Sequence, residues 1–484
     1  MELKDSALFR QECYIDGVWV KGQESFEVID PADGRVVGSV PSLGREATGK
    51  AIAAANAAYP GWKGLTAKER SVILKRWYGL IVEHQNDLAM IMTREQGKPL
   101  AEAAGEVLYG ASYIEWFAEE AKRVYGDTIP TTHKGKRIIV LKEPVGVCAA
   151  ITPWNFPSAM ISRKAAPALA AGCPVIVKPA AQTPFSALAL AELADRAGFP
   201  PGVFNVITGP ASEIGGELTR NPLVRKLSFT GSTPVGKLLM AACADTVKKI
   251  SLELGGHAPF IVFDDADLDQ AVAGALASKY RNSGQTCVCA NRFLVQEGVY
   301  ELFAEKLAAA VRSEFRVGPG VEKGNNQGPL IDLNAVIKVE AQIEDALQKG
   351  ARLAVGGKRF GEKGFFFEPT VLVDVTSEMR IAREETFGPV APLFVFKDEA
   401  DAVRMANDSE YGLASYFYSR DIGRAWRVTE ALEYGMVGVN TGVLSSEAAP
   451  FGGMKESGIG REGSKYGIEE YLEIKYMCIG GIDL

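Results

Sequence analysis

Histidine is scarce in this sequence of 484 residues, with only three, at positions 84, 133 and 257. Because they lie far apart in the chain, we expect no metal site with histidine and cysteine ligands. The seven cysteines are an odd and scattered set, at positions 13, 148, 173, 243, 287, 289 and 478. Such usage favours a reducing compartment over a disulfide framework. The net charge is −7 without a basic block, so nucleic-acid binding has little electrostatic support.

Long apolar runs are also missing. The longest, from Ala165 to Val177, contains two prolines and is too short to cross a bilayer. Residues Met1–Ser6 show neither the apolar core of a signal peptide nor a transit pattern. We therefore expect a cytoplasmic protein that does not bind membranes. A hydrophobic content of 47% with 23% charged residues is typical of a soluble globular enzyme.

The first part of the chain changes from strands to helices. Short strands and turns are expected over 14–40, and Ala- and Leu-rich stretches with helical spacing follow at 45–60, 67–95 and 101–124. A polar turn beside a short strand occupies 126–144. Two interpretations of this segment stay open, an arm that leaves the domain and an internal hairpin.

Strands and helices then alternate in two regions. In the first, strands are expected at 145–151, 175–177, 203–207 and 226–229, with helices at 158–171, 184–197, 212–220 and 234–247. In the second, strands are expected at 258–263, 292–296, 366–374, 390–397 and 437–439, with helices at 267–280, 298–314, 333–349, 398–408 and 421–433. A Gly-rich loop at 451–461 and a strand-like tail at 471–479 follow. This alternation predicts an α/β fold with two doubly wound parallel sheets. Ligands of such sheets bind beyond the carboxyl ends of the strands.

The stretch Arg281–Arg292 places two cysteines, Cys287 and Cys289, in a Gly-containing break after a helix-like run. A thiol on a loop at a helix end can be held rigidly and still reach a substrate. The alternative is that each cysteine is a small buried packing residue. The polar frame Gln285-Thr286-Cys287 is a poor core sequence and favours a reactive thiol.

Three further features carry chemistry. Glu253 lies in an apolar run, where burial raises the pKa of a carboxyl toward that of a useful general base, unless it is a solvated surface residue. Gly231-Ser232 forms a turn between a strand and a helix, suited to a phosphate or simply an ordinary turn. Lys178 follows a buried strand and can present its ammonium to ribose or phosphate, or to solvent. An Asp265-x-Asp267-x-Asp269 pattern lacks the glycine and glutamate of a calcium loop.

Together and in order, seven motifs resemble the signature set of the NAD(P)-dependent aldehyde dehydrogenases. They are Pro153-Trp154-Asn155-Phe156-Pro157, Lys178-Pro179-Ala180, Phe229-Thr230-Gly231-Ser232, Glu253-Leu254-Gly255-Gly256, Gly284-Gln285-Thr286-Cys287, Glu385-Thr386-Phe387-Gly388-Pro389 and Pro450-Phe451-Gly452-Gly453. The stretches 282–292 and 154–164 are similar to the succinate-semialdehyde dehydrogenases within that family. The resemblance implies oxidation of succinate semialdehyde to succinate, late in 4-aminobutyrate breakdown.

The resemblance also implies a mechanism. Cys287 is expected to attack the aldehyde, and Asn155 with the backbone N–H of Cys287 to hold the oxyanion of the thiohemiacetal. After hydride transfer, Glu253 is expected to activate the water that hydrolyses the thioester.

For the cofactor, the resemblance implies Lys178 at the adenosine ribose, Gly231 and Ser232 at the pyrophosphate, and Glu385 at the nicotinamide ribose. Trp154 and Phe387 complete this expected set. NAD-preferring relatives often carry a glutamate where this chain has Ala181, and a glutamate there would repel a 2′-phosphate. We therefore expect NADP, with NAD as the alternative.

For the substrate, the resemblance points to Arg163, Arg281 and Ser445 as a clamp for the distal carboxylate. Phe156 and Phe451 are expected to line the same site. Arginine suits such a clamp because its guanidinium bonds carboxylates in two places. The alternatives are that Arg281 caps a helix end and that Arg163 faces solvent. Cys289 is either a redox partner that closes a disulfide with Cys287 or a packing residue.

Several alternatives stay open at this point. Glutarate semialdehyde is one methylene longer, and one methylene gives only about 10–200-fold discrimination. A coenzyme-A-acylating enzyme has no need of Glu253, and an enzymatically silent, crystallin-like relative has no need of Cys287, Glu253 or Asn155. We expect a dinucleotide-binding domain at 1–125 and 145–256, a catalytic domain at 257–455, and an oligomerisation arm and tail at 126–144 and 470–484. The family usually assembles as dimers or tetramers.

Overall fold

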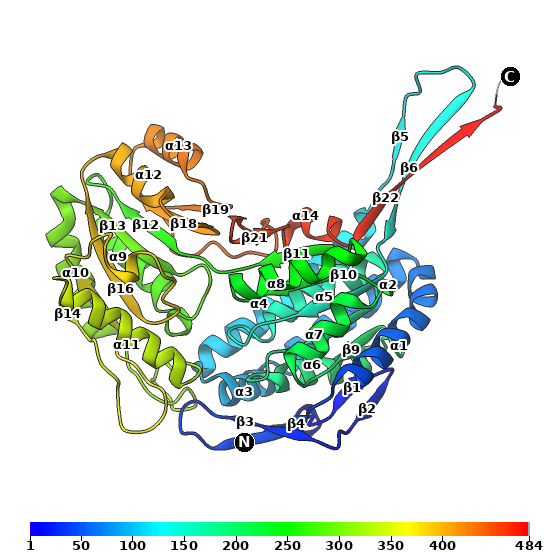
Figure 1. Ribbon diagram of the computed structural model, residues 1–484, viewed down its shortest axis with the longest axis horizontal. Helices are drawn as coiled ribbons and strands as arrows, with labels where there is room; N and C mark the ends of the chain where they lie inside the picture. The colour runs from blue at the N-terminus through cyan, green and yellow to red at the C-terminus, as the bar shows by residue number, and fades with distance from the viewer. Residues whose placement is uncertain (483–484) are drawn as a thin grey trace.

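The first region of strand–helix alternation forms an eight-stranded sheet in the computed structural model, which describes residues 1–482 (Figure 1). Its strand order is β2-β1-β9-β8-β7-β10-β11-β21. The strands are β1 (Cys13–Ile15), β2 (Val18–Val20), β7 (Val147–Ile151), β8 (Val175–Lys178), β9 (Phe204–Val206), β10 (Val224–Thr230), β11 (Lys249–Glu253) and β21 (Gly458–Ile459). The five strands from β9 to β11 are parallel, and antiparallel strands close both edges.

Helices cover both faces of this sheet. Consecutive residues of a strand point to opposite sides of the sheet, and in the central strands both sides are apolar. In β7, Cys148 and Ala150 belong to one hydrophobic core, and Val147 and Ala149 belong to the other. The first core lies under α2 (Ala67–Glu83), α3 (Gln85–Gln96), α4 (Leu100–Glu120), α5 (Ala159–Ala171) and α6 (Pro184–Ala197). The second core lies under α1 (Arg45–Gly64), α7 (Ala211–Arg220) and α8 (Thr233–Cys243).

The second region forms a seven-stranded sheet with the order β14-β15-β16-β13-β12-β18-β19. Its strands are β12 (Ala258–Val262), β13 (Ala290–Gln296), β14 (Arg352–Val355), β15 (Thr370–Val373), β16 (Val390–Phe396), β18 (Ala414–Tyr418) and β19 (Met436–Val439). One face packs on α9 (Leu268–Lys279) and α10 (Tyr300–Glu314), and the other on α11 (Leu333–Gln348), α12 (Glu399–Asn407) and α13 (Ile422–Ala431). The predicted α/β fold with two doubly wound sheets is therefore confirmed.

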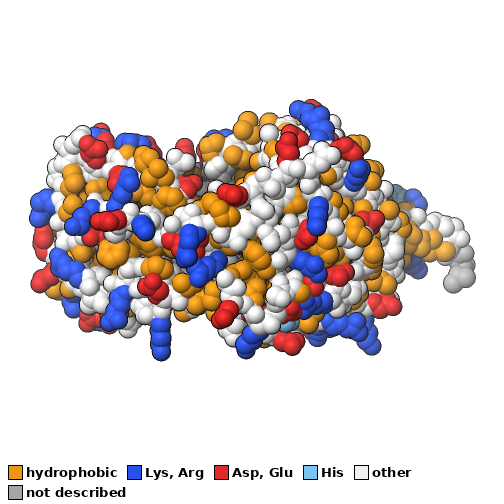
Figure 2. Space-filling view, turned by 90° about the horizontal axis from the view of Figure 1, so that it is seen from below, with side chains coloured by type: hydrophobic (Ala, Val, Ile, Leu, Met, Phe, Trp, Pro, Cys, Tyr) orange, Lys and Arg blue, Asp and Glu red, His pale blue; other side chains and the backbone are white. Residues whose placement is uncertain are grey.

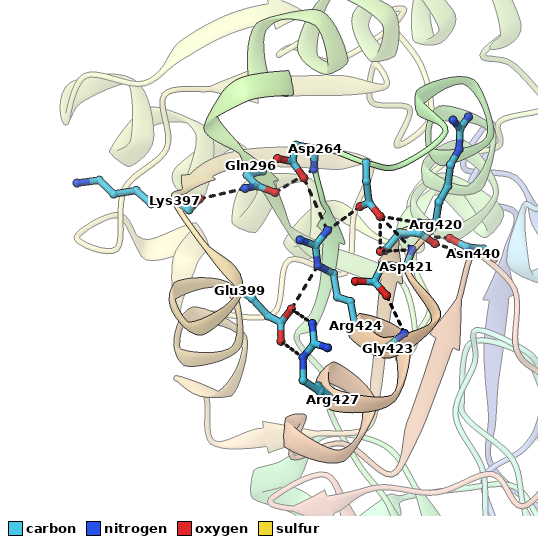
Figure 3. Close-up of polar contacts among 12 residues, drawn as sticks. Asp264, Gln296, Lys397, Glu399, Arg420, Asp421, Gly423, Arg424, Arg427 and Asn440 are labelled. Atoms are coloured by element: carbon cyan, nitrogen blue, oxygen red, sulfur yellow. Dashed lines mark hydrogen bonds and ion pairs between the residues drawn. The ribbon is translucent and has the colours of Figure 1, made fainter.

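Paired charges close the carboxyl end of this second sheet (Figure 3). Arg424 and Arg427 on α13 both bond Glu399 on α12, at 3.3 and 2.8 Å. Arg424 also lies 3.7 Å from Asp264, which follows β12. The charged groups at this edge therefore pair with one another.

Several predicted boundaries differ from the observed ones for local reasons. The single helical stretch expected over 67–95 is two helices that meet at His84. The strand expected from Val145 begins at Val147, because Gly146 takes a left-handed conformation at φ +122°. The expected Gly-rich loop contains β20 (Met454–Lys455), which pairs with β17 (Tyr411–Gly412), and β21, and the helix α14 (Ser464–Glu469) follows it.

The segment 126–144 is a hairpin that leaves the body of the molecule (Figure 1). Its strands β5 (Asp127–Ile129) and β6 (Lys136–Pro144) form a three-stranded antiparallel sheet with the C-terminal strand β22 (Leu472–Gly480). Ile474 and Tyr476 on β22 are 70% and 61% exposed, which leaves apolar area uncovered in one copy of the chain. A separate hairpin, β3 (Ser25–Ile29) with β4 (Val36–Pro41), lies near the N-terminus.

The face shown in Figure 2 carries positive and negative side chains interspersed among apolar ones. In the part of the chain that the structure describes, no helix is long and apolar enough to cross a membrane.

Candidate active site

Most of the predicted site residues come together between the two sheets. The register of the first sheet places Ile151 beside Lys178 and Thr230 beside Glu253, so β7, β8, β10 and β11 end at one edge. The amino ends of the second sheet face that edge, with Cys287 before β13 and Glu385 before β16. A hydrogen bond of 2.9 Å from the Gly256 N–H to Glu385 Oε1 ties the loop after β11 to the loop before β16.

A cavity of about 310 Å³ opens at this junction. It is lined by seven of the predicted residues, namely Trp154, Asn155, Gly231, Ser232, Cys287, Glu385 and Phe387. Sequence reasoning missed others in the same wall, among them Met160, Leu254, Ile331, Asp332 and Lys338. A larger cavity of about 490 Å³ lies elsewhere on the second sheet, but its charged groups are engaged, such as Arg383 with Asp408 at 2.9 Å. The smaller cavity therefore holds the candidate site.

Cys287 is half-buried and lines this cavity on one side and a much smaller one on the other. Burial raises the pKa of its thiol to about 12, while the positive charge of Arg163 acts in the opposite direction. Among the described residues, no acceptor takes the backbone N–H of Cys287. The residue thus offers a thiol and a free N–H donor at one point, and the reactive interpretation is favoured over the packing one.

Asn155 is buried in the loop after β7. Its Nδ2 donates to the carbonyl of Gln285 at 3.0 Å, which fixes the orientation of the amide beside the Cys287 loop. Its Oδ1 has no hydrogen-bond partner in the described residues. One N–H of the side-chain amide is used in this bond, and the second is left for a ligand in the cavity.

Glu253 ends β11 and is only 3% exposed, which excludes the solvated-surface interpretation. Burial raises the pKa of its carboxyl well above the usual range, and the charge of Glu462 raises it further. The cations Arg163 and Lys164 act against this shift. Glu253 Oε2 has no partner among the described residues. An uncommitted carboxyl with a raised pKa is suited to proton transfer with water.

The small cavity on the far side of Cys287 gathers the five residues predicted for the substrate. Arg163, Arg281, Phe156, Ser445 and Phe451 all line it. Arg163 is 1% exposed, so it does not face solvent from its helix. Its Nε donates to Glu462 at 2.6 Å, and its guanidinium lies 3.9 Å from the centre of the Phe451 ring. Its second terminal nitrogen has no partner in the part of the chain that the structure describes.

Arg281 follows α9 and is half-buried. Its guanidinium lies 5.2 Å from the centre of the Phe156 ring, and none of the described residues bonds it. The helix-cap interpretation therefore has no bond to support it. Two guanidinium groups with unused donors, one hydroxyl and two aromatic rings can together hold a short molecule with an anionic end.

Glu462 is a buried partner of the predicted site residue Arg163 that sequence reasoning missed. It lies in the loop before α14, is 4% exposed, and pairs with both Arg163 and Lys164. Burial alone raises the pKa of a carboxyl, but these two cations hold the pKa of Glu462 below its usual value. No local pattern marks it, because its partner Arg163 is 299 positions away.

Comparison with known proteins decides the family. A model described as the aldehyde dehydrogenase family matches residues 19–477. The chain belongs to the aldehyde dehydrogenase family.

Its relatives within the family are close. The chain is 65% identical over 482 residues to the NADP(+) succinate-semialdehyde dehydrogenase of Escherichia coli K12, covering 99% of this chain and 100% of that one. It is 64% identical to a glutarate-semialdehyde dehydrogenase of Pseudomonas aeruginosa, with 100% of both chains covered. A crystal structure of an E. coli NADP dependent enzyme matches with a TM-score of 0.98 and 65% identity, covering 99% of this chain and 100% of that one. The resemblance seen in the motifs is confirmed.

The residues present fit the dinucleotide that aldehyde dehydrogenases use. Ser232 is the N-cap of α8, and within the described residues its side chain makes no cap hydrogen bond, so the hydroxyl and the helix N-terminus are both available to a phosphate. Burial raises the pKa of Glu385 at the cavity wall to about 7. Lys178 and Ala181 do not line this cavity. Lys178 is buried at the end of β8 and bonds the carbonyl of Pro179 at 3.1 Å, and Ala181 is exposed in the loop beyond.

Cys289 is fully buried, and both it and Cys287 are free thiols. Its Sγ donates to the carbonyl of Gly284 at 3.2 Å and lies 3.6 Å from Nζ of Lys279. A disulfide with Cys287 requires this sulfur to leave both partners.

Proposed function

We propose that this aldehyde dehydrogenase oxidises succinate semialdehyde to succinate with reduction of NADP. The observation that supports this most is the position of Arg163 and Arg281 beside Cys287, because all three residues line the same small cavity. The aldehyde carbon then meets the thiol while the carboxylate meets the two guanidinium groups. Several charge-assisted bonds to one carboxylate give both affinity and orientation.

Cys287 is the proposed nucleophile. Its thiolate attacks the aldehyde carbon, and the carbonyl oxygen becomes the anion of a thiohemiacetal. The free N–H of Asn155 Nδ2 and the backbone N–H of Cys287 hold that oxygen. One such donor contributes about 3–4 kcal/mol to the transition state. Burial raises the pKa of Cys287, and the positive charge of Arg163 acts against that rise and so favours the thiolate.

Trp154, Gly231, Ser232, Glu385 and Phe387 would hold the nicotinamide dinucleotide, with Lys178 and Ala181 at its adenosine end. When bound, the dinucleotide supplies the acceptor for the hydride that leaves the thiohemiacetal carbon. The exposed Ala181 leaves room for a 2′-phosphate and Lys178 offers a positive charge, which supports NADP over NAD.

Glu253 is the proposed base for the second half of the reaction. Its ionised carboxylate takes a proton from water, and the resulting hydroxide attacks the thioester carbon on Cys287. The thiolate leaves and the carboxylic acid is released. A thiol serves both halves because thiolate is a strong nucleophile and a good leaving group. The place of Glu253 favours hydrolysis over transfer of the acyl group to coenzyme A.

Glutarate semialdehyde is the second candidate substrate, because a glutarate-semialdehyde dehydrogenase is as similar to this chain as the succinate-semialdehyde dehydrogenase. Steady-state kinetics with both semialdehydes, each with NADP and NAD, tests the proposal. We expect the largest kcat/KM for succinate semialdehyde with NADP. A larger value for glutarate semialdehyde refutes the substrate, and no turnover of either semialdehyde refutes the reaction.

We also propose a function for each part of the chain, as the family resemblance implies. We assign cofactor binding to 1–125 and 145–256, catalysis to 257–455, and assembly into dimers or tetramers to the arm at 126–144 and the tail at 470–484. The uncovered apolar residues of β22 support the last assignment.

A further inference from the structure

A buried ion pair lies directly behind the loop that carries Asn155. It joins Lys98, two residues after α3, to Glu106 on α4, and both side chains are 1% exposed. Neither residue lines the cavity itself. A buried ion pair adds little net stability compared with apolar residues of the same size. Stability alone therefore does not explain this pair, and its contacts with the Asn155 loop suggest that it fixes the geometry of that loop.

The ammonium of Lys98 is aimed at the backbone of Asn155. Its Nζ donates to the carbonyl oxygen of Asn155 at 2.7 Å and lies 4.0 Å from the centre of the Phe156 ring. Glu106 Oε1 accepts the N–H groups of Ser158 and Ala159, at 2.9 and 3.2 Å. One charged pair therefore fixes this loop at the carbonyl of Asn155 and at the start of α5.

A second branch reaches the Cys287 loop from the same segment. The side chain of Gln96 accepts the N–H of Lys98 at 3.0 Å and donates to Asn282 Oδ1 at 3.0 Å. The amide of Asn282 in turn donates to the same Asn155 carbonyl at 3.0 Å. Glu102 Oε2 accepts the backbone N–H of Asn282 at 3.0 Å.

This branch holds a turn that is costly to form. Asn282 and Ser283 have φ of +51° and +56°, in the left-handed region that residues with a Cβ seldom adopt. Such a conformation persists only where its surroundings fix it. The two loops that supply the proposed oxyanion donors are thus bound to one another and to the segment 96–106.

We propose that Lys98, supported by Glu106, is a positioning residue that sets the Asn155 amide against the Cys287 N–H. This inference rests on the proposed function, because it assigns Lys98 to the oxyanion site of that reaction. Lys98 acts through Asn155 and does not contact the substrate. A displacement of about 1 Å at such a donor can cost on the order of 100-fold in rate. The loss cannot exceed that of removing the donor itself, about 100- to 1000-fold.

A double-mutant cycle tests this role. Lys98→Met, Asn155→Ala and the double variant are mixed with succinate semialdehyde and NADP, and the rate of the first turnover of NADPH is measured. We expect Lys98→Met to lower this rate about 10- to 100-fold with little change in KM. In the Asn155→Ala background, Lys98→Met should lower it no further, because the group through which it acts is gone.

Lys226→Met is the matched control. Lys226 is also fully buried and bonds Ser251 at 2.5 Å, away from the cavity lining. It is expected to lower the thermal unfolding temperature without lowering the first-turnover rate. If Lys98→Met does not fold, Glu106→Gln, which keeps the acceptor for Ser158 and Ala159, takes its place in the same cycle.

The outcomes separate the two claims. Equal losses from Lys98→Met in both backgrounds, or no loss in either, overturn the positioning role while the proposed function stands. A wild-type rate in Asn155→Ala alone overturns the oxyanion assignment, and the positioning role falls with it.

Discussion

Replacing Arg281 by methionine separates recognition of the substrate's carboxylate from the chemistry at Cys287. Arg281 is the better probe of the two arginines, because no group in residues 1–482 bonds its guanidinium, whereas Arg163 pairs with the buried Glu462. Methionine keeps an unbranched apolar stem beside Phe156 and removes the charge. We expect kcat/KM for succinate semialdehyde to fall while that for butanal, which lacks the carboxylate, stays the same.

The size of this effect follows from the bond that is lost. A hydrogen bond to a charged group contributes about 1.5–3 kcal/mol, which corresponds to about 10- to 150-fold in kcat/KM. Arg281 is half-buried, so solvent screening places the loss in the lower part of that range. The loss should appear mainly in KM, because the carboxylate is bound equally before and during the reaction.

The assay is initial-rate NADPH formation at several concentrations of each aldehyde. Arg420→Met is the control, since Arg420 lies at the far end of the second sheet (Figure 3) and pairs with Asp267 at 3.1 Å. It should leave both values unchanged. Equal losses on the two aldehydes in Arg281→Met would refute a carboxylate clamp at this residue.

Three further predictions concern the cofactor, the base and the second thiol. Ala181→Glu should lower the NADP/NAD ratio of kcat/KM about tenfold, because about 1.4 kcal/mol of like-charge repulsion with the 2′-phosphate corresponds to that factor. An unchanged ratio contradicts the placement of Ala181 at the adenosine end of the cofactor. Because burial raises the pKa of Glu253 and only its ionised form accepts a proton, hydrolysis of the acyl-enzyme should slow as pH falls through that raised pKa. In Glu253→Gln this limb of the pH–rate profile should be absent. Because Cys289 is fully buried and bonds Gly284, Cys289→Ala should leave inactivation by peroxide and its reversal by dithiothreitol unchanged, and an altered profile would support a redox switch.

Hydrophobic periodicity predicted both sheets because their central strands are buried on both faces. Such strands are short apolar runs bounded by polar loops, as in Val175–Lys178 and Ala258–Val262. The parallel strands β11 and β18 and the antiparallel edge strands β14 and β21 were not predicted. β21 is two residues of a Gly-rich loop, and its pairing with Leu252 and Glu253 depends on the tertiary fold.

The residues of the candidate site also fall into two groups, those that the sequence predicted and those that it did not. Residues such as Asn155 and Cys287 could be proposed from sequence because each lies in a short motif that resembles the signature of the family. Glu462 and Lys98 could not, because each acts through a partner distant in sequence. Glu462 lies 299 positions from Arg163, and Lys98 lies 57 from Asn155. A buried lysine or glutamate in a loop, as both of these are, looks the same in sequence as a solvated one until its partner is known.

The central claim is that Cys287 carries the acyl group and that Glu253 is needed to release it. Rapid mixing of Glu253→Gln with succinate semialdehyde and NADP, with NADPH followed in time, tests both parts at once. The account predicts a burst of one NADPH for each active subunit, then almost no turnover, and an acyl group on Cys287 by mass spectrometry of the quenched protein. Continued turnover at the wild-type rate, or a burst that leaves Cys287 unmodified, would contradict it.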